Sequence, residues 1–152
     1  MPELPEVETV RKGLSSRLRG FQIKTLEISR DRLISSPGGV KDFTEILNGA
    51  IVGSWERRGK YLIASLLRKC KSPGQQVIAS GYWGVHLRMT GHFQWYENSS
   101  PPCSHTRARF WNTFGQELRF VDIRSFGQMW SVPPGCKPEV VITGLKKLGP
   151  EP

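Results

Sequence analysis

The stretch "IVGSWERRGKYLIASLL" (residues 51–67) decides the fold. It contains two short β-like runs on either side of the turn pair Arg58-Gly59. Similar runs follow, separated by turn signals such as "SPG" (72–74) and "NSSPP" (98–102); they span residues 75–80, 85–96, 107–114, 117–122 and 126–132. Many short strands with no helices between them predict an antiparallel β-sandwich or barrel.

Two helices are predicted before this β-rich region. In the first, Pro5 suits the opening turn, and apolar residues recur every three or four positions until a stop at Gly20; they are Leu4, Val7, Val10, Leu14 and Leu18. The second lies within "VKDFTEILNG" (40–49), and "FQIKTLEI" (21–28) between them has the pattern of a strand. We therefore predict a mainly β fold, an antiparallel β-sandwich flanked by an N-terminal helix and a second helix near 40–48.

Size and composition are those of one globular domain. The 152 residues are 38% hydrophobic and 23% charged, with no run of eighteen apolar residues and no apolar signal sequence. These features predict a cytoplasmic protein without a membrane span. Cys70, Cys103 and Cys136 form no CxxC pair, so neither a disulfide framework nor a metal site is expected. We predict a domain over 1–135 and the start of an interdomain linker over the Pro- and Gly-rich segment 136–152.

The positive charge is concentrated in the middle of the chain. The net charge is +9, and residues 57–116 hold nine basic side chains against Glu97 alone, whereas eight basic and eight acidic side chains cancel in residues 1–56. Such a block is typical of a protein with a polyanionic partner, most simply nucleic acid. A solvated basic face that only aids solubility is the alternative.

The first three residues allow covalent amine chemistry. Removal of Met1 would expose the secondary amine of Pro2, a fraction of which is unprotonated at neutral pH because an α-amino group titrates near ~8. Such an amine condenses with an aldehyde to a cationic iminium, which is an electron sink, and Glu3 could transfer protons beside it. With Met1 retained the amine is blocked. The alternative is an ordinary trimmed N-terminus.

Six stretches in order carry a resemblance to a known family. They are "MPELPEVETV" (1–10), "RRGKYL" (57–62), "HLRMTG" (86–91), "HTRARF" (105–110), "DIRSFG" (122–127) and "LGPEP" (148–152). The sequence closely resembles the N-terminal catalytic domain of formamidopyrimidine-DNA glycosylases, a family that includes endonuclease VIII. The resemblance extends over essentially the whole chain.

The resemblance implies catalytic roles for four residues. Pro2 matches the Schiff-base nucleophile that attacks C1′ of the damaged nucleotide, and Glu3 matches the general acid/base beside it. Glu6 matches a second, supporting acidic position, although a first-turn partner of the helix dipole explains it equally well. Lys60 matches a lysine that binds a phosphate beside the lesion and assists β-elimination; the alternative is a solvated turn lysine.

The resemblance also implies DNA contacts. His105 and Arg124 match phosphate contacts. Met89, Arg124 and Phe126 match a trio that fills the gap left by the flipped nucleotide, a task that suits apolar wedges and a cation. Without the family match, Met89 and Phe126 are interpreted as strand core. Ser125 departs from the family, which usually has a basic residue there, so we expect a modest loss of phosphate affinity.

The resemblance therefore implies a monomeric base-excision repair enzyme that acts on damaged double-stranded DNA. It would be a bifunctional glycosylase and abasic-site β-lyase for oxidised purines (8-oxoguanine and formamidopyrimidines). Leu4 and the trio match the branch of the family that acts on oxidised purines, whereas the endonuclease VIII branch usually has other residues at these positions. Two alternatives stay open, namely endonuclease VIII-like action on oxidised pyrimidines and a basic DNA-binding module without turnover. The family continues past "LGPEP" into a helix–two-turn–helix domain and a zinc finger. No cofactor is thus expected in this chain, and the family's one zinc ion would lie in that finger.

Overall fold

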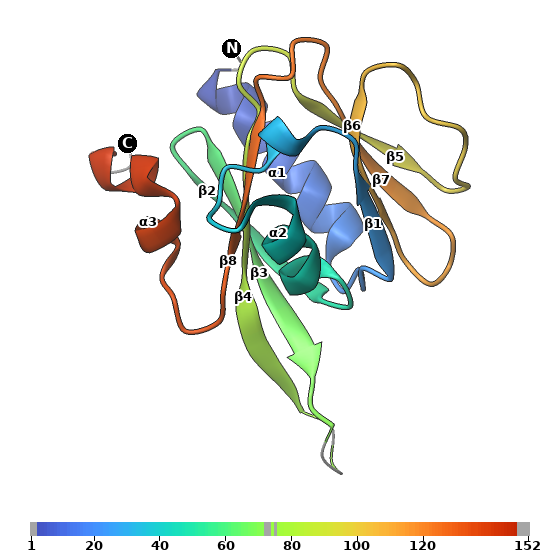
Figure 1. Ribbon diagram of the computed structural model, residues 1–152, viewed down its shortest axis with the longest axis vertical. Coiled ribbons are helices and arrows are strands. Elements are labelled where there is room, and N and C mark those ends of the chain that lie inside the picture. The colour runs from blue at the N-terminus through green and yellow to red at the C-terminus, as the bar shows by residue number, and fades with distance from the viewer. Residues whose placement is uncertain (1–2, 72–73, 75, 149–152) are drawn as a thin grey trace.

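The computed structural model describes residues 3–71, 74 and 76–148, and its centre is a β-sandwich. Two antiparallel four-stranded sheets have the orders β1-β6-β7-β5 and β2-β3-β4-β8 (Figure 1). The strands are β1 (Thr25–Ile28), β2 (Ile51–Arg58), β3 (Tyr61–Lys69), β4 (Val77–His86), β5 (His92–Tyr96), β6 (Thr106–Trp111), β7 (Glu117–Val121) and β8 (Gln128–Val132). The predicted sandwich is confirmed.

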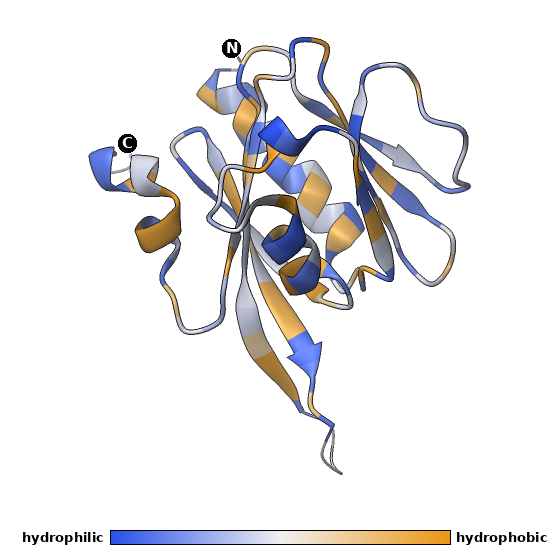
Figure 2. Cartoon of the chain, in the orientation of Figure 1, coloured by the Kyte–Doolittle hydropathy of each residue, from blue (hydrophilic) through white to orange (hydrophobic). Residues whose placement is uncertain are grey.

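Both predicted helices are present and pack against the sandwich. They are α1 (Leu4–Leu18), which lies along β2, and α2 (Gly39–Leu47), which lies against β8 and β4. A short 3-10 helix, η1 (Asp31–Leu33), precedes α2. Apolar residues alternate with polar ones along α1 and α2 (Figure 2), and the buried ones join the core between the sheets. The ring of Trp83 is buried in this core, 4.7 Å from the ring of Phe110 in the opposite sheet.

The segment 21–28 is only partly a strand of the sandwich. The carbonyl of Phe21 accepts from the amide of Val52 in β2 and the amide of Ile23 donates to the carbonyl of Ala50 just before β2, whereas residues 25–28 pair with β6 in the other sheet. The chain thus crosses from one sheet to the other near residue 24. An alternating pattern cannot reveal this crossing, because the two halves have the same periodicity.

The apolar run 85–96 is two strands and a turn. β4 ends at His86 and β5 begins at His92, and the amide of Gly91 closes the intervening turn by donating to the carbonyl of Leu87 (3.0 Å). Met89 therefore lies in a loop. The bend separates two strands that belong to different sheets, a tertiary feature that apolar spacing does not encode.

A third, short helix was missed by the sequence analysis. It is α3 (Pro138–Val141), and the 3-10 helix η2 (Thr143–Lys147) follows it. Ile142 and Leu145 are buried with Trp130 and Ile63 in a second apolar cluster on sheet β2-β3-β4-β8. Gly84 allows this approach, because a Cβ there would lie 2.4 Å from Cδ1 of Ile142. The division into 1–135 and 136–152 stays a prediction.

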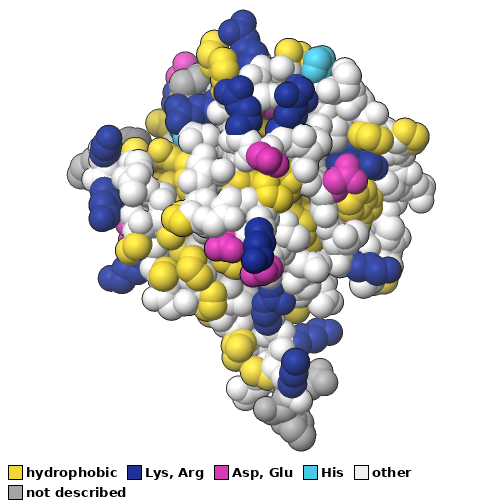
Figure 3. All heavy atoms as spheres, in the orientation of Figure 1, with side chains coloured by type: hydrophobic (Ala, Val, Ile, Leu, Met, Phe, Trp, Pro, Cys, Tyr) yellow, Lys and Arg dark blue, Asp and Glu magenta, His cyan; other side chains and the backbone are white. Residues whose placement is uncertain are grey.

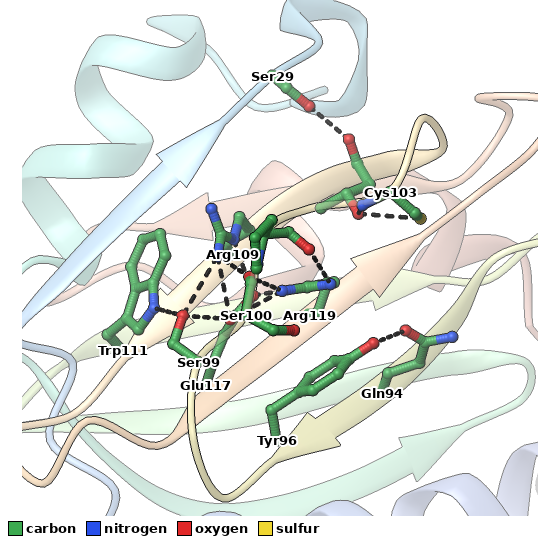
Figure 4. Close-up of polar contacts among 12 residues, drawn as sticks. Ser29, Gln94, Tyr96, Ser99, Ser100, Cys103, Arg109, Trp111, Glu117 and Arg119 are labelled. Carbon is green, nitrogen blue, oxygen red and sulfur yellow. Dashed lines mark hydrogen bonds and ion pairs between the residues drawn. The ribbon is translucent and has the colours of Figure 1, made fainter.

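A buried ion cluster on β6 and β7 fixes the loop between β5 and β6 (Figure 4). The Glu117 carboxylate is fully buried and accepts hydrogen bonds from Arg109 (Nε, 2.8 Å), Arg119 (Nε, 2.7 Å) and Ser99 (2.8 Å). Both arginines also donate to the carbonyl of Ser100 at 2.7 Å. The network therefore joins two strands to a loop that has no regular structure of its own.

Cys70, Cys103 and Cys136 are free thiols. Among the helices in the described part of the chain, none is both long enough and apolar enough to cross a membrane.

Candidate nucleic-acid interface

Two loops at one end of the sandwich expose the predicted gap-filling trio. The β4–β5 loop (87–91) carries Met89, and the β7–β8 loop (122–127) carries Arg124 and Phe126 (Figure 1). Met89 is 50% exposed and Phe126 45% exposed. The interpretation of these two residues as strand core is therefore wrong, and their role in filling a gap in DNA stays a prediction.

A residue with strained backbone directly precedes both Met89 and Phe126. Arg88 (φ +57°) and Ser125 (φ +56°) are the two non-glycine residues with positive φ in the described part of the chain. Arg88 directly precedes Met89, and Ser125 directly precedes Phe126. A left-handed conformation costs a non-glycine residue about 1–3 kcal/mol and is concentrated at functional sites. The strain thus marks these two loops as candidates for function.

Asp122 joins the two loops into one unit. Its carboxylate is fully buried; one oxygen accepts from the hydroxyl of Thr90, and the other accepts from the amide of Gly127 at 2.7 Å. The same Thr90 hydroxyl accepts from the amide of Arg124 (3.3 Å). Hydrogen bonds to a buried charged group are the stronger kind, so they fix the positions of the loops relative to each other.

Two glycines allow both loops to approach the ring of Phe120 in β7. A Cβ on Gly91 would lie 2.6 Å from its Cζ, and a Cβ on Gly127 would lie 2.8 Å from the same atom. Any side chain at either position would push its loop away from the core. The close packing of both loops on Phe120 therefore requires glycine at the last position of "HLRMTG" and of "DIRSFG".

His105 belongs to the same group of loops. It is half-buried just before β6, and its carbonyl accepts from the amide of Asp122 (3.0 Å). The neighbouring Arg107 is buried and donates to the carbonyl of Asp122 (2.9 Å). Arg107 therefore holds the backbone of the β7–β8 loop rather than facing solvent.

Lys60 lies at the tip of the β2–β3 hairpin. Arg58 pairs with Tyr61, which leaves a two-residue turn in which Gly59 supplies the positive φ (+59°) that such a turn needs. Lys60 is half-buried there. The next residue, Tyr61, contacts the ring of His86 edge-on, with 4.8 Å between the ring centroids. The charge of Lys60 contributes to lowering the pKa of His86.

His86 is neutral at physiological pH. Burial, followed by the charges of Arg88 and Lys60, lowers the pKa of His86 to about 4. Its Nδ1 accepts a hydrogen bond from the amide of Arg88 (3.1 Å), so the proton of the neutral ring is on Nε2. This hydrogen bond helps to fix the backbone of Arg88, which has a positive φ.

The start of α1 is linked to the Lys60 hairpin through Glu8. Its carboxylate lies 3.5 Å from Nε of Arg57 in β2. Glu3 is exposed at the N-cap, and its side chain makes no capping hydrogen bond; Glu6 is exposed in the first turn. Pro2 lies outside the described residues, and the proposed catalytic roles of all these residues remain untested predictions.

The charge block is partly neutralised within the fold. Of its nine cations, Arg57 pairs with Glu8, Arg58 with Glu139 and Arg109 with Glu117. Arg68 donates to backbone carbonyls at the end of α2. Lys and Arg side chains nevertheless gather at the end that bears the two loops, with hydrophobic side chains among them (Figure 3). The cations available to a polyanion are therefore fewer than the sequence count.

The sequence analysis missed the residues that support the interface, above all Asp122, Thr90 and Arg107. All three lie inside quoted motifs, but no periodicity distinguishes a buried hydrogen-bonded side chain from a solvated one. Within residues 3–71, 74 and 76–148, no three His, Cys, Asp or Glu side chains cluster as metal ligands would. The zinc expected of the family stays a prediction.

Comparison with solved structures gives the class of the protein. The chain aligns over 99% of its length with the Lactococcus lactis Fpg in complex with an abasic site containing DNA, at TM-score 0.78 and 29% identity, covering 50% of that chain. A complex of the same enzyme with a FAPY-dG containing DNA matches at TM-score 0.78 and 29% identity, covering 98% of this chain and 50% of that one. The fold is therefore that of one half of a DNA glycosylase.

Sequence comparison then gives the family. The profile of the formamidopyrimidine-DNA glycosylase N-terminal domain matches residues 1–129. A formamidopyrimidine-DNA glycosylase of Prochlorococcus marinus (strain MIT 9313) is 61% identical over all of this chain and 53% of its own length. The chain belongs to the formamidopyrimidine-DNA glycosylase family, and it spans about half the length of the curated relatives it matches.

Proposed function

We propose that this chain is the catalytic N-terminal part of a bifunctional DNA glycosylase and abasic-site β-lyase that removes oxidised purines. One observation carries the proposal: two loops, each with a strained residue beside an exposed apolar side chain, are locked together by one buried carboxylate. A rigid pair of apolar wedges suits a protein that holds a nucleotide out of the duplex, because the wedges offset the cost of unstacking.

The proposed chemistry begins at Pro2. Its amine forms a bond to C1′ of the damaged nucleotide while the bond from C1′ to the base breaks, and the base leaves with a proton from Glu3. The amine proton is then lost and the C1′–O4′ bond of the sugar breaks, with O4′ taking up a proton, which leaves a cationic Schiff base. This Schiff base withdraws electrons, so the C2′ proton passes to the Glu3 carboxylate and the bond to the 3′-phosphate breaks as a C=C double bond forms. Lys60 binds a phosphate beside the lesion; its position at a hairpin tip linked to α1 supports this role.

Oxidised purines are the proposed substrates because Leu4 and the trio resemble that branch of the family. The Lactococcus lactis relative has been solved with a FAPY-dG containing DNA and also with an oxidised pyrimidine containing DNA, so the choice rests on Leu4 and the trio. Cleavage of 8-oxoguanine duplex against thymine-glycol duplex tests it: preference for thymine glycol would favour the endonuclease VIII-like alternative. A monomer in the cytoplasm, with damaged double-stranded DNA as partner, completes the proposal.

Borohydride trapping tests the chemistry and separates an enzyme from a passive DNA-binding module. The chain, checked by mass spectrometry for loss of Met1, is mixed with single-stranded DNA that holds one abasic site, and borohydride then reduces any Schiff base to a stable amine. We expect a covalent adduct that peptide mapping assigns to Pro2. The matched control is the same chain with an acetylated N-terminus, which cannot form the imine.

Glu3→Gln separates the two steps. This variant should still be trapped on a ready-made abasic site, because imine formation does not need the acid, but it should no longer excise a damaged base. An adduct on a lysine, or no adduct with the unblocked chain, would contradict the role of Pro2. Excision at the parent rate by Glu3→Gln would contradict the role of Glu3.

A further inference from the structure

A cavity next to the β4–β5 and β7–β8 loops is lined by two arginines to which the proposed function gives no role. It is open to solvent and has a volume of about 450 Å³ between residues 31–35, here called the η1 segment, and the two loops. Its lining includes Arg32 and Ser35 from the η1 segment, Met89 and Phe126 from the loops, and Arg88 and Gln128. We call it the Arg32 cavity.

The walls of the Arg32 cavity are held in place by hydrogen bonds. The Arg88 guanidinium donates to the side-chain oxygen of Gln128 (Nε, 2.9 Å), whose amide nitrogen donates to the Ser35 hydroxyl (3.0 Å). The backbone of Ser35 donates to the carbonyl of Met129 in β8 (2.8 Å). The η1 segment is thus attached to the same strand that follows the β7–β8 loop, and the cavity exists before any ligand arrives.

Arg32 presents a charge that the fold does not neutralise. Its side chain is exposed, and its guanidinium carbon lies 5.9 Å from the centre of the Phe126 ring, a cation–π contact. It forms no ion pair with a carboxylate in the described part of the chain. The ring therefore orients the guanidinium while its hydrogen-bond donors remain available to a ligand.

The lining selects an anion. It holds the two guanidiniums of Arg32 and Arg88, the polar side chains of Ser35 and Gln128, and no carboxylate. A planar guanidinium with free donors matches the oxygens of a phosphate. Because the cavity borders the two side chains proposed to enter the duplex, the nearest phosphate would be one in the DNA backbone.

We propose that Arg32 binds a backbone phosphate of the DNA, next to the wedge and separate from the phosphate assigned to Lys60. This inference rests on the proposed function, since it needs DNA on this face. It makes the η1 segment a part of the DNA-binding surface, with Phe126 and Arg32 acting as a pair: the ring faces the bases and the cation faces the backbone.

Salt-dependent binding of duplex DNA tests the proposal. Binding of the chain to a fluorescently labelled 8-oxoguanine duplex and to the matching undamaged duplex is measured between 50 and 200 mM salt, for the parent, Arg32→Ala, Arg32→Lys and Arg30→Ala. Arg30 is the matched control, because it is an exposed arginine two residues away that does not line the cavity. Thermal unfolding confirms that each variant is folded.

We expect Arg32→Ala to bind both duplexes about tenfold more weakly and to lower the slope of log K against log salt by about 0.9, the value for one phosphate contact. Arg32→Lys should keep the slope, and Arg30→Ala should match the parent. Equal losses for Arg32→Ala and Arg30→Ala, or no loss for either, would overturn this inference alone. A parent chain that binds neither duplex would overturn the proposed function and this inference with it.

Discussion

Replacing Glu117 by Gln should destabilise the protein in a strongly pH-dependent way. The Glu117 carboxylate is fully buried between two guanidiniums that lie 2.7 and 2.8 Å away (Figure 4). Burial by itself raises its pKa, but the hydrogen bonds from Arg109, Arg119 and Ser99 outweigh burial and lower the pKa of Glu117 from 4.5 to about 2. The network therefore favours the charged carboxylate strongly.

The size of the effect follows from this pKa. At about 1.4 kcal/mol for each pKa unit, the change corresponds to about 3 kcal/mol of folding free energy. Arg109 keeps 11% of its side chain exposed, so solvent screens part of this interaction and we expect about 2 kcal/mol. Because the folded pKa lies below the unfolded one, this stability is present above pH 4.5 and is lost as the pH falls toward about 2.

Urea unfolding followed by tryptophan fluorescence measures the prediction. Glu117→Gln should lose about 2 kcal/mol relative to the parent at pH 7, a midpoint shift of about 1 M urea. The loss should shrink between pH 4.5 and 3, because in this range the carboxylate takes up a proton in the unfolded parent but stays charged in the folded parent, whereas the glutamine amide does not titrate. Glu45→Gln, the same substitution at an exposed position of α2, should stay within about 0.5 kcal/mol of the parent.

Two results would refute this reasoning. A stability difference between parent and Glu117→Gln that is the same at pH 7 and pH 3 would show that the lost energy is not that of the charged carboxylate. An equal loss in Glu45→Gln would show that burial between the arginines contributes nothing.

Three further predictions concern the interface. Asp122→Ala should lower the free energy of unfolding by about 3 kcal/mol in urea melts, because the amide of Gly127 and the hydroxyl of Thr90 both lose a charged acceptor; a loss under about 1 kcal/mol would contradict this. Gly127→Ala should cost about 1–3 kcal/mol and lower Tm, since its Cβ would lie 2.8 Å from the Phe120 ring, and an unchanged Tm would show that the ring can yield. Lys60→Ala should weaken binding to damaged and undamaged duplex alike and lower the salt slope by about one charge; a loss confined to damaged DNA, with the slope unchanged, would argue against a phosphate contact.

The local patterns of the sequence predicted the elements of the fold well. α1 and α2 follow from apolar residues at spacings of three and four, and the strands follow from short apolar runs between Gly, Pro and Ser. These signals are local, because each helix or strand buries one face of its own. The motifs that carry the family resemblance are local as well, so the family could be named before the fold was known.

Local sequence patterns gave wrong predictions where contacts between distant segments set the structure. The run 85–96 divides because β4 and β5 belong to different sheets, and the apolar Met89 is exposed at the bend between them. The charge block loses Arg109 to Glu117, a partner on the neighbouring strand that the sequence count placed outside the block.

Only the tertiary structure could bring Thr90, Asp122 and Gly127 together, and only it could put the guanidinium of Arg32 over the ring of Phe126. Such contacts join residues far apart in the chain, and their energy depends on burial and orientation that no single segment contains. The sequence by itself determined the elements, the family motifs and the candidate chemical groups. The packing of the two sheets decided which of those groups are buried as supports and which remain on the surface.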